Sequence, residues 1–407
     1  EDPHEHRVPD ADREDQPRPG VTDVAGLADV LSDEGWPYAS SLPAAPGDPG
    51  RFHALFGRDS LITSLQVLPA QPDIARATLR ALASRQGQVF DRGTQEAPGK
   101  IGHEFRDAPP ESFVGWPPGP FRYYGTADAT SWFVVVLAAL DDSGLTVELE
   151  PNWRAAGDWL RAELDDGDGL IRHTGGTLGG LTQQGWRDAV DPVADGNGGG
   201  ILRPDGTRPV PPLADADTQA VTAVALRALA RLSGSAEWLR RHDRLRGLLT
   251  RTYLPDVMLV DADGPVIGAG SQLGWLLWAD ALEPEAVPAA AGRLVRPDIR
   301  TSYGLRTLSS DSPVFAVDAY HRGTVWPFDS WLGWGGLRAS GRMQEAEALR
   351  RGILDATKQL GGYPELYGVT TDDGLVHVPA ANHVQAWTVG AAWALTNEWD
   401  GRPATLF

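Results

Sequence analysis

Apolar residues recur along most of the chain at the three- to four-residue spacing of an α-helix. Strand patterns are weak and confined to connecting segments such as DVMLVDADGPVIGAG. The periodicity therefore predicts an all-α fold. Its helices are expected over residues 21–35, 57–70, 72–86, 126–142, 151–165, 216–233, 235–253, 270–282, 284–296, 324–340, 342–360 and 382–398.

The predicted helices are of two kinds that alternate along the chain. Segments such as RMQEAEALRRGILDATKQL carry one apolar stripe and are otherwise charged, which is typical of a helix on the outside of a fold. Segments such as ATSWFVVVLAAL and SQLGWLLWADAL are apolar nearly all round and must be buried on most sides. This alternation predicts an (α/α)6 barrel, in which six inner helices are ringed by six outer ones.

The connections between these helices also alternate in length. Those from an inner to an outer helix are short, such as SGS at 233–235 and SGR at 340–342. Long loops in a compact domain usually carry function. Because the long connections lead into the inner helices, we expect the site at the rim where those helices begin and their dipoles present positive ends. The long connections cover residues 87–125, 166–215, 254–269, 297–323 and 361–381.

Composition narrows the class of partner. The chain of 407 residues has a net charge of −19, which argues against nucleic acids and anionic membranes, because phosphate binding needs basic patches. The absence of cysteine excludes disulfides and cysteine-based metal or redox chemistry. The 15 Trp favour a carbohydrate partner without deciding for one, since indole rings stack on sugars but also fill cores.

The ends of the chain and its apolar runs bear on localisation. No apolar run is long enough to read as a membrane span. Residues 1–20 are polar and charged, unlike a signal peptide. We therefore expect a cytoplasmic protein, with a flexible polar arm over residues 1–20 and a single catalytic domain over residues 21–407.

Two acids stand in aromatic surroundings within different long connections. Asp188 follows Trp186 in TQQGWRDAVDP, and Glu365 lies in LGGYPELYG. The alternatives are a fold-stabilising turn for the first and an exposed loop acid for the second. Glycoside hydrolysis, however, needs two carboxyl groups on opposite sides of the scissile bond, and burial tunes their ionisation. These two acids form the best candidate pair, with Asp191 as a fallback for Asp188.

Other polar residues at the same rim have both a structural and a binding interpretation. Arg58 and Asp59 in LFGRDSLIT either stabilise a helix start or hold sugar hydroxyls. His103 and Glu104 in PGKIGHEFRD form either a surface ion cluster or part of a site, and they lack metal-ligand spacing. A group at the N-terminus of the helix expected at 324–340, with Thr324 as its N-cap, favours ligand contact. That group is Tyr320, His321 and Trp326.

Seven motifs in order along residues 51–395 resemble those of a known enzyme group. The motifs resemble the amylo-α-1,6-glucosidase type of glycogen debranching enzyme. The wider group is the inverting (α/α)6 glucosidases, which include mannosylglycerate and glucosylglycerate hydrolases. The motifs are LFGRDSLIT, PGKIGHEFR, YGTADATSWFV, QGWRDAVD, YHRGTVWPFD, GGYPELYG and VQAWTVGA.

The resemblance implies an inverting, exo-acting hydrolase that releases glucose from α-glucosides without a metal or cofactor. It makes Asp188 the general acid and Glu365 the general base, with Arg58 and Asp59 holding the terminal glucose. The β-rich N-terminal domain and transferase activity of full debranching enzymes are not visible, and the loop at 193–213 is unusual. A small α-glucoside is therefore an alternative substrate. The pocket would be lined by His103, Glu104, Trp186, Tyr320, His321, Trp326, Gln385 and Trp387.

Two functions from other classes stay open at this point. A sugar epimerase with the same barrel would use a histidine pair as acid and base, for which His321 and His383 are the candidates. A sugar-binding barrel without catalysis is the other, although both carboxyl groups are present. A test for epimer formation and one for glucose release separate these from a hydrolase.

Overall fold

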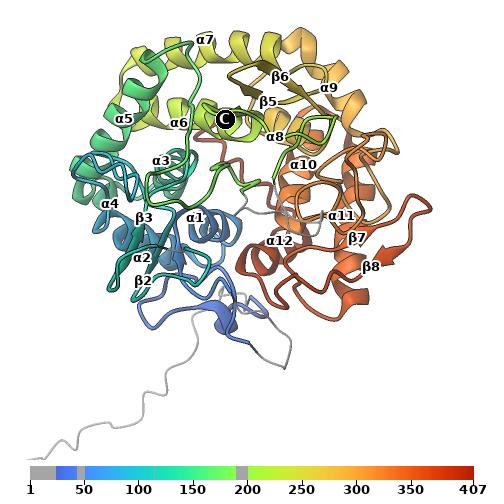
Figure 1. The fold of residues 1–407 in the computed structure, drawn as a ribbon, viewed down its shortest axis with the longest axis horizontal. Helices are drawn as coiled ribbons and strands as arrows, with labels where there is room; N and C mark the ends of the chain where they lie inside the picture. Colours follow the sequence, from blue (N-terminus) through green and yellow to red (C-terminus); the bar gives the residue numbers. More distant parts are fainter. Residues whose placement is uncertain (1–23, 44–50, 114, 189–199) are drawn as a thin grey trace, which may run out of the picture.

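A computed structural model describes residues 24–43, 51–113, 115–188 and 200–407. Within these residues, inner helices pack each against the next, and α12 returns to α1 to close a ring (Figure 1). The predicted (α/α)6 barrel is thereby confirmed. The inner helices are α1 (Gly57–Gln66), α3 (Ala129–Leu140), α6 (Ala216–Ser233), α8 (Gln272–Trp278), α10 (Pro327–Ala339) and α12 (Ala386–Thr396).

A second ring of helices surrounds the first. Most outer helices pack on one or two inner ones, as α2 does on α1 and α3. This position explains the sequence pattern: α3 is buried over every residue but its last, whereas α11 buries one stripe of its surface. The outer elements are α2 (Pro72–Ala83), α4 (Ser143–Glu148), α5 (Glu150–Asp165), α7 (Ala236–Tyr253), η2 (Pro284–Ala286), α9 (Val287–Leu294) and α11 (Met343–Leu360).

The outer helix predicted over residues 21–35 is not formed. The described part of this range contains only a short 3-10 turn, η1 (Ala28–Val30). Gly26 and Gly35 adopt left-handed φ values of 83° and 86°, which interrupt a right-handed helix. Val24, Leu27 and Val30 still pack into an apolar cluster with residues of α2 and α12. The apolar spacing was therefore read correctly as burial but wrongly as a helix.

Several other helix ends differ from the prediction. α10 begins at Pro327, so Trp326 rather than Thr324 is its N-cap residue. The Thr324 hydroxyl instead donates to the Tyr320 carbonyl at 2.7 Å. α8 and α12 are shorter than predicted. The helix α4 was not predicted; it is capped by the Asp142 side chain, which accepts from the Leu145 amide at 3.0 Å.

Within the described residues, the segments around the starts of the inner helices form three small antiparallel sheets. The first joins β1 (Leu55–Phe56), β2 (Glu104–Arg106) and β3 (Phe121–Tyr123), with Phe56 opposite Glu104 and Glu104 opposite Tyr123. This pairing brings the start of α1 beside the 98–107 stretch. The others are β4 (Ala214–Asp215), β5 (Val257–Asp261) and β6 (Gly264–Ile267), and β7 (Gly368–Val369) with β8 (Leu375–Val376).

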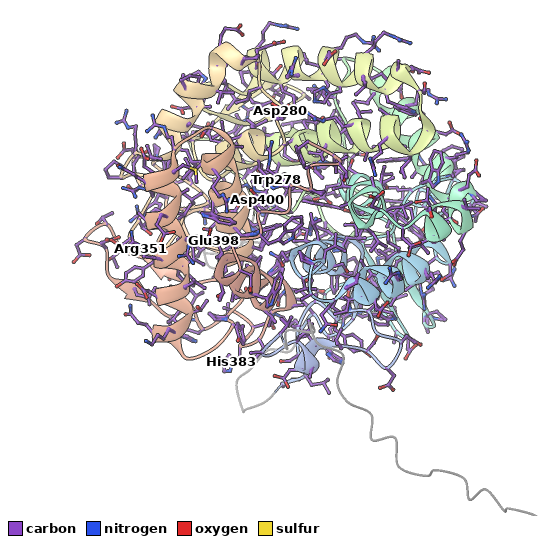
Figure 2. All side chains as sticks on the ribbon, turned by 180° about the vertical axis from the view of Figure 1, so that it is seen from behind. Trp278, Asp280, Arg351, His383, Glu398 and Asp400 are labelled. Atoms are coloured by element: carbon purple, nitrogen blue, oxygen red, sulfur yellow. The ribbon has the colours of Figure 1, made fainter. Side chains whose placement is uncertain are left out.

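The C-terminal segment crosses the opposite end of the barrel (Figure 2). The Trp278 indole donates to the Asp400 carbonyl at 2.7 Å, and the Trp399 indole donates to the Leu65 carbonyl at 2.8 Å. Backbone and indole groups thus tie the ends of α1 and α8 together there. None of the helices within the described ranges is both long and apolar enough to cross a bilayer.

Candidate active site

The inner helices begin at one rim, and polar side chains stand at their starts. Helix α1 opens with Arg58 and Asp59, and α6 has Asp217 in its first turn. The rim sequence QGWRD, in the connection before α6, ends at Asp188. The N-cap positions of the other inner helices are Asp128 for α3, Ser271 for α8, Trp326 for α10 and Gln385 for α12.

Arg58 lies among three carboxyl groups. Its Nη2 is 2.5 Å from Asp188 Oδ2, its Nη1 is 3.2 Å from Asp128 Oδ1, and its Nε is 3.7 Å from Asp59 Oδ2. The Arg58 side chain is 3% exposed, so its charge is screened little by water. One buried cation therefore holds together acids from α1, the start of α3 and the QGWRD turn.

Arg58 also decides how Asp188 ionises. Burial pushes the pKa of Asp188 upward, but the charge of Arg58 and the nearby His321 outweigh it, and the pKa falls below its usual value. Burial raises the pKa of Asp59 to about 7, because Arg58 is farther from it and other carboxylates oppose its ionisation. At neutral pH the unliganded site thus holds an ionised Asp188.

Glu365 is surrounded by neutral hydrogen-bond donors. The Tyr320 hydroxyl donates to its Oε1, and the amide and Nδ2 of Asn382 both donate to Oε2 at 3.1 Å. Glu365 is 1% exposed. Burial raises its pKa to about 7, and the hydrogen bonds from Tyr320 and Asn382 only partly oppose this. Sequence reasoning missed Asn382, although it lies in the ANHVQAW stretch that drew attention.

Two consecutive residues join the acids. Tyr320 contacts Glu365, and His321 Nε2 lies 3.9 Å from Asp188 Oδ1. The charge of Asp188 also contributes to raising the pKa of Glu365, as expected for carboxyl groups that share a site. The structure therefore brings Asp188 and Glu365 into one site from different long connections.

Aromatic rings pack against the His321 imidazole. Its imidazole stacks on Trp326 with centroids 5.0 Å apart, and Trp186 meets both rings edge-on. Trp186 is 1% exposed and stacks on Trp275 at 6.0 Å. Trp186 is thus covered by other rings, whereas we expected it to face the sugar. Trp387, 4% exposed, stacks on Phe328 at 3.9 Å in the same aromatic layer.

His103 and Glu104 are buried, so they do not form the surface ion cluster that was one interpretation. The His103 carbonyl accepts from the Gly57 amide at 3.0 Å, which places it next to Arg58. Burial lowers the pKa of His103 to about 3, so its imidazole is neutral. Burial raises the pKa of Glu104 to about 7 despite its ion pair with Arg106.

Other expected residues fall elsewhere. His383 is exposed, and its ring lies 6.3 Å from that of His377, so it does not join His321 as an epimerase pair would require. Figure 2 shows it at the edge of the molecule. Asp191 lies outside the described residues.

In the described ranges, no group of three or more His, Cys, Asp or Glu is placed to hold a metal ion.

A cleft opens beside the loop that carries Tyr320 and His321. Its volume is about 440 Å³. The described part of the 193–213 loop forms one side, and it is fixed by Arg203, which pairs with Asp261 at 2.5 Å. The cleft is lined by Leu202, Gly206, Arg208, Pro313, Val314, Phe315 and Arg322.

Known structures share this fold. The mannosylglycerate hydrolase of Thermus thermophilus, of family GH63, superposes with a TM-score of 0.67 at 17% identity in its complex with Tris and D-glycerate, covering 91% of this chain and 98% of that one. Its complex with glucose gives 0.61 at 19% identity over 92% and 99%. A wild-type glycosidase gives 0.55 at 18% identity over 93% and 95%.

Sequence comparison reaches the family level. No curated protein sequence is significantly similar to the chain. The family model described as the mannosylglycerate hydrolase MGH1-like glycoside hydrolase domain, in contrast, matches residues 136–388. This match falls within the wider group that the motifs resemble, while the debranching type stays a prediction. The chain belongs to the MGH1-like family of glycoside hydrolases.

Proposed function

We propose that the protein is an inverting, exo-acting hydrolase that releases glucose from α-glucosides, with Asp188 as general acid and Glu365 as general base. The observation that carries this proposal is that two consecutive residues reach both carboxyl groups: Tyr320 donates to the buried Glu365, and His321 lies 3.9 Å from the partly exposed Asp188. An inverting mechanism needs one carboxyl group at the leaving oxygen and the other at a water on the opposite face of the sugar.

The surroundings of each carboxyl group suit its proposed role. Ionised Glu365 accepts hydrogen bonds from Tyr320 and Asn382, which fix both of its oxygens and aim the carboxylate at the water. Asp188 is the more accessible of the two, with 21% of its side chain exposed, so a glycosidic oxygen can approach it. The carboxyl groups are expected to lie roughly 6.5–9.5 Å apart when substrate and water are bound.

The unliganded site holds its proton on the wrong carboxyl group for turnover. Arg58 keeps Asp188 ionised, while burial keeps Glu365 largely protonated below pH 7. Sugar hydroxyls that accept hydrogen bonds from Arg58 compete with Asp188 for it. We propose that glucose binding draws Arg58 from Asp188, so that the single proton moves to Asp188 and Glu365 becomes the base.

The cleft lined by Arg322 suits the aglycone. It lies next to the proposed catalytic loop and is large enough for a small group, and Arg208 and Arg322 contribute to its lining. A small α-glucoside is therefore the preferred substrate over a branched dextrin. The glucose and D-glycerate complexes of the Thermus enzyme support a substrate that contains a sugar and a small polar partner.

A substrate panel followed by NMR tests this function. The purified protein is incubated with isomaltose, kojibiose, nigerose, maltose, trehalose, glucosylglycerate and a limit dextrin. The first product is expected to be β-glucose from one of the small glucosides. Trehalose is read only for cleavage, because inversion itself yields one α- and one β-glucose from it. For the other members, α-glucose in excess of the anomeric mixture that a reducing-end glucose contributes contradicts inversion, and release of no glucose from any member contradicts the α-glucosidase assignment.

A further inference from the structure

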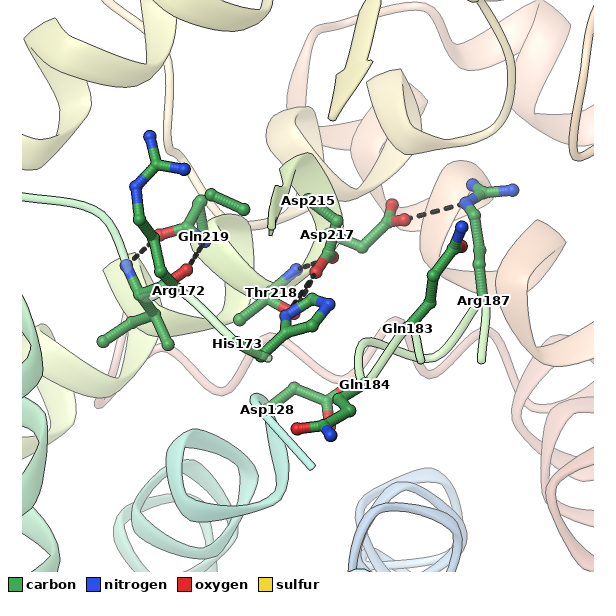
Figure 3. A network of polar contacts seen from close by, with 12 residues as sticks. Asp128, Arg172, His173, Gln183, Gln184, Arg187, Asp215, Asp217, Thr218 and Gln219 are labelled. Carbon is green, nitrogen blue, oxygen red and sulfur yellow. Dashed lines mark hydrogen bonds and ion pairs between the residues drawn. The ribbon is translucent and has the colours of Figure 1, made fainter. Parts of the chain in front are cut away.

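Arg187 stands between Trp186 and Asp188 but points away from the proposed sugar site. Its Nε donates to Asp217 Oδ2 at 2.9 Å, and both residues are 2% exposed at the side chain (Figure 3). Its guanidinium also lies 4.4 Å from the centre of the Trp186 ring. Neither the resemblance to the inverting (α/α)6 glucosidases nor the proposed mechanism assigns a role to this buried arginine.

The other two donors of Arg187 reach separate parts of the rim. Nη2 donates to Ser271 Oγ at the start of α8, and Nη1 donates to the Thr307 carbonyl, both at 2.9 Å. Together with Asp217 at the start of α6, these contacts fix the guanidinium in one orientation, because its planar fork matches acceptors in fixed directions. The backbone beside Asp188 is thereby tied to the barrel.

A chain of hydrogen bonds continues from Thr307 towards the base. The Thr307 hydroxyl accepts from the Gly323 amide at 2.9 Å and donates to the Thr324 carbonyl at 3.0 Å. The Thr324 hydroxyl donates to the carbonyl of Tyr320, whose own hydroxyl donates to Glu365. Arg187 thus connects the turn that carries one carboxyl group with the loop that holds the other.

Glutamine side chains fix the other side of the QGWRD turn. Gln183 Nε2 donates to the Ile201 carbonyl and its Oε1 accepts from the Ile201 amide, both at 2.7 Å. Gln184 donates to Gln95 Oε1 at 2.8 Å. Arg187 is therefore the anchored residue immediately next to Asp188 along the chain, while Gln183 and Gln184 fix the residues before it.

We propose that Arg187, held by Asp217, is a positioning residue that sets the placement of the Asp188 carboxyl group relative to Glu365. This proposal rests on the proposed function for its kinetic test but not for its structural one. Arg187 reaches no reacting atom: its donors are taken up by Asp217, Ser271 and Thr307, and it is buried. Its effect on the reaction passes through the backbone of its neighbour.

Removing the ion pair while keeping its volume tests this proposal. The double variant Arg187→Met/Asp217→Leu removes both charges of this ion pair, so neither is left buried without the other, and it retains the fold better than either single change. Arg187→Lys is a milder variant that keeps the charge but loses the fork. The control is Arg241→Met/Asp165→Asn, which removes a two-pronged pair of the outer ring, with N–O distances of 2.7 and 3.0 Å.

The readout compares leaving groups that differ in their need for a proton. Turnover of methyl α-glucoside by the double variant is expected to fall at least about 100-fold, because an error near 1 Å in the placement of a catalytic group costs that much. Turnover of α-glucosyl fluoride, which needs little proton donation, is expected to fall less than about tenfold. Arg187→Lys should show the same split to a smaller extent, and the control should show none.

Parallel losses for the two substrates, or no loss for either, would overturn the proposal. A wild-type protein that cleaves neither compound contradicts the proposed function instead. In that case crystal structures of the wild type and the double variant still decide about Arg187. A separation between the Asp188 and Glu365 carboxyl carbons that differs by more than about 0.5 Å supports it, and an unchanged separation refutes it.

Discussion

The two carboxyl groups of the site lie at the same rim but among different partners. Asp188 faces the cation of Arg58, whereas Glu365 faces the neutral donors of Tyr320 and Asn382. The pKa of Asp188 is lowered and that of Glu365 is raised to about 7. The comparison teaches that an opposite charge outweighs burial here, while hydrogen bonds from neutral groups do not.

Neutralising either carboxyl group should have the largest effect. Asp188→Asn and Glu365→Gln are each expected to lower kcat on methyl α-glucoside by about 10³-fold or more, because each removes one proton transfer from the transition state. Steady-state kinetics measures the loss, and circular dichroism checks that the fold survives. A variant that retains a near-normal kcat has lost no catalytic group, and its residue must be reassigned.

Removing Arg58 tests how its charge stabilises ionised Asp188. Arg58→Met leaves the buried Asp59 and Asp128 and the partly exposed Asp188 without their cation, so we expect a loss of about 3–5 kcal/mol in the free energy of unfolding at pH 7. The pKa of Asp188 is lower in the folded than in the unfolded protein. Its ion pair with Arg58 therefore contributes its full stability above the unfolded-state pKa, and this contribution is lost as pH falls through the folded-state pKa. The difference between wild type and variant should therefore shrink in urea titrations at pH 3.

An exposed ion pair provides the control for Arg58. Arg80 pairs with Glu148 at 2.6 Å, and both side chains are about half exposed. Arg80→Met is expected to cost about 0–1 kcal/mol at pH 7, because solvent screens the pair. Equal losses for Arg58→Met and Arg80→Met would show that Arg58 is not the central cation of a buried network.

The pH dependence of kcat/KM tests the role of the neutral donors around Glu365. The active form carries one proton on the pair, so kcat/KM is expected to fall as pH rises through about 7, where Glu365 loses the last proton. The Tyr320 hydrogen bond favours ionised Glu365, so Tyr320→Phe should move this limb to higher pH. Tyr253→Phe is the control, since its hydroxyl donates to the Ala214 carbonyl at 2.9 Å. If the fall of kcat/KM moves to lower pH in Tyr320→Phe, or does not move, the role of Tyr320 is contradicted.

The smallest effect is expected next to the base. His383 follows Asn382 but is exposed. His383→Gln should therefore leave kcat/KM within about twofold of the wild type, as for most surface changes. A loss comparable to that of Glu365→Gln would revive the histidine-pair chemistry of an epimerase.

Sequence patterns predicted the barrel because helical periodicity and burial on one or all sides are local properties. They failed at 21–35, where apolar spacing persists but Gly26 and Gly35 break the helix. Motifs singled out Arg58, Asp188 and Glu365, and the structure brings these residues into one site. Their selection came from the acids themselves and from the resemblance.

The supporting residues escaped sequence analysis for a physical reason. Asp128, Asn382 and Asp217 act through contacts with residues distant in the chain, which their sequence neighbours do not reveal. Trp186 shows the converse, since its motif suggested a sugar contact while the fold covers it with other rings. The burial of these residues and their contacts across the barrel become visible only in the three-dimensional structure.

The most direct test of the central claim compares two variants on α-glucosyl fluoride. This substrate needs a base to activate water but little help from an acid. Asp188→Asn should therefore retain most of its turnover, whereas Glu365→Gln should lose it. The opposite pattern, with turnover lost in Asp188→Asn and retained in Glu365→Gln, would contradict the assignment of Asp188 as acid and Glu365 as base.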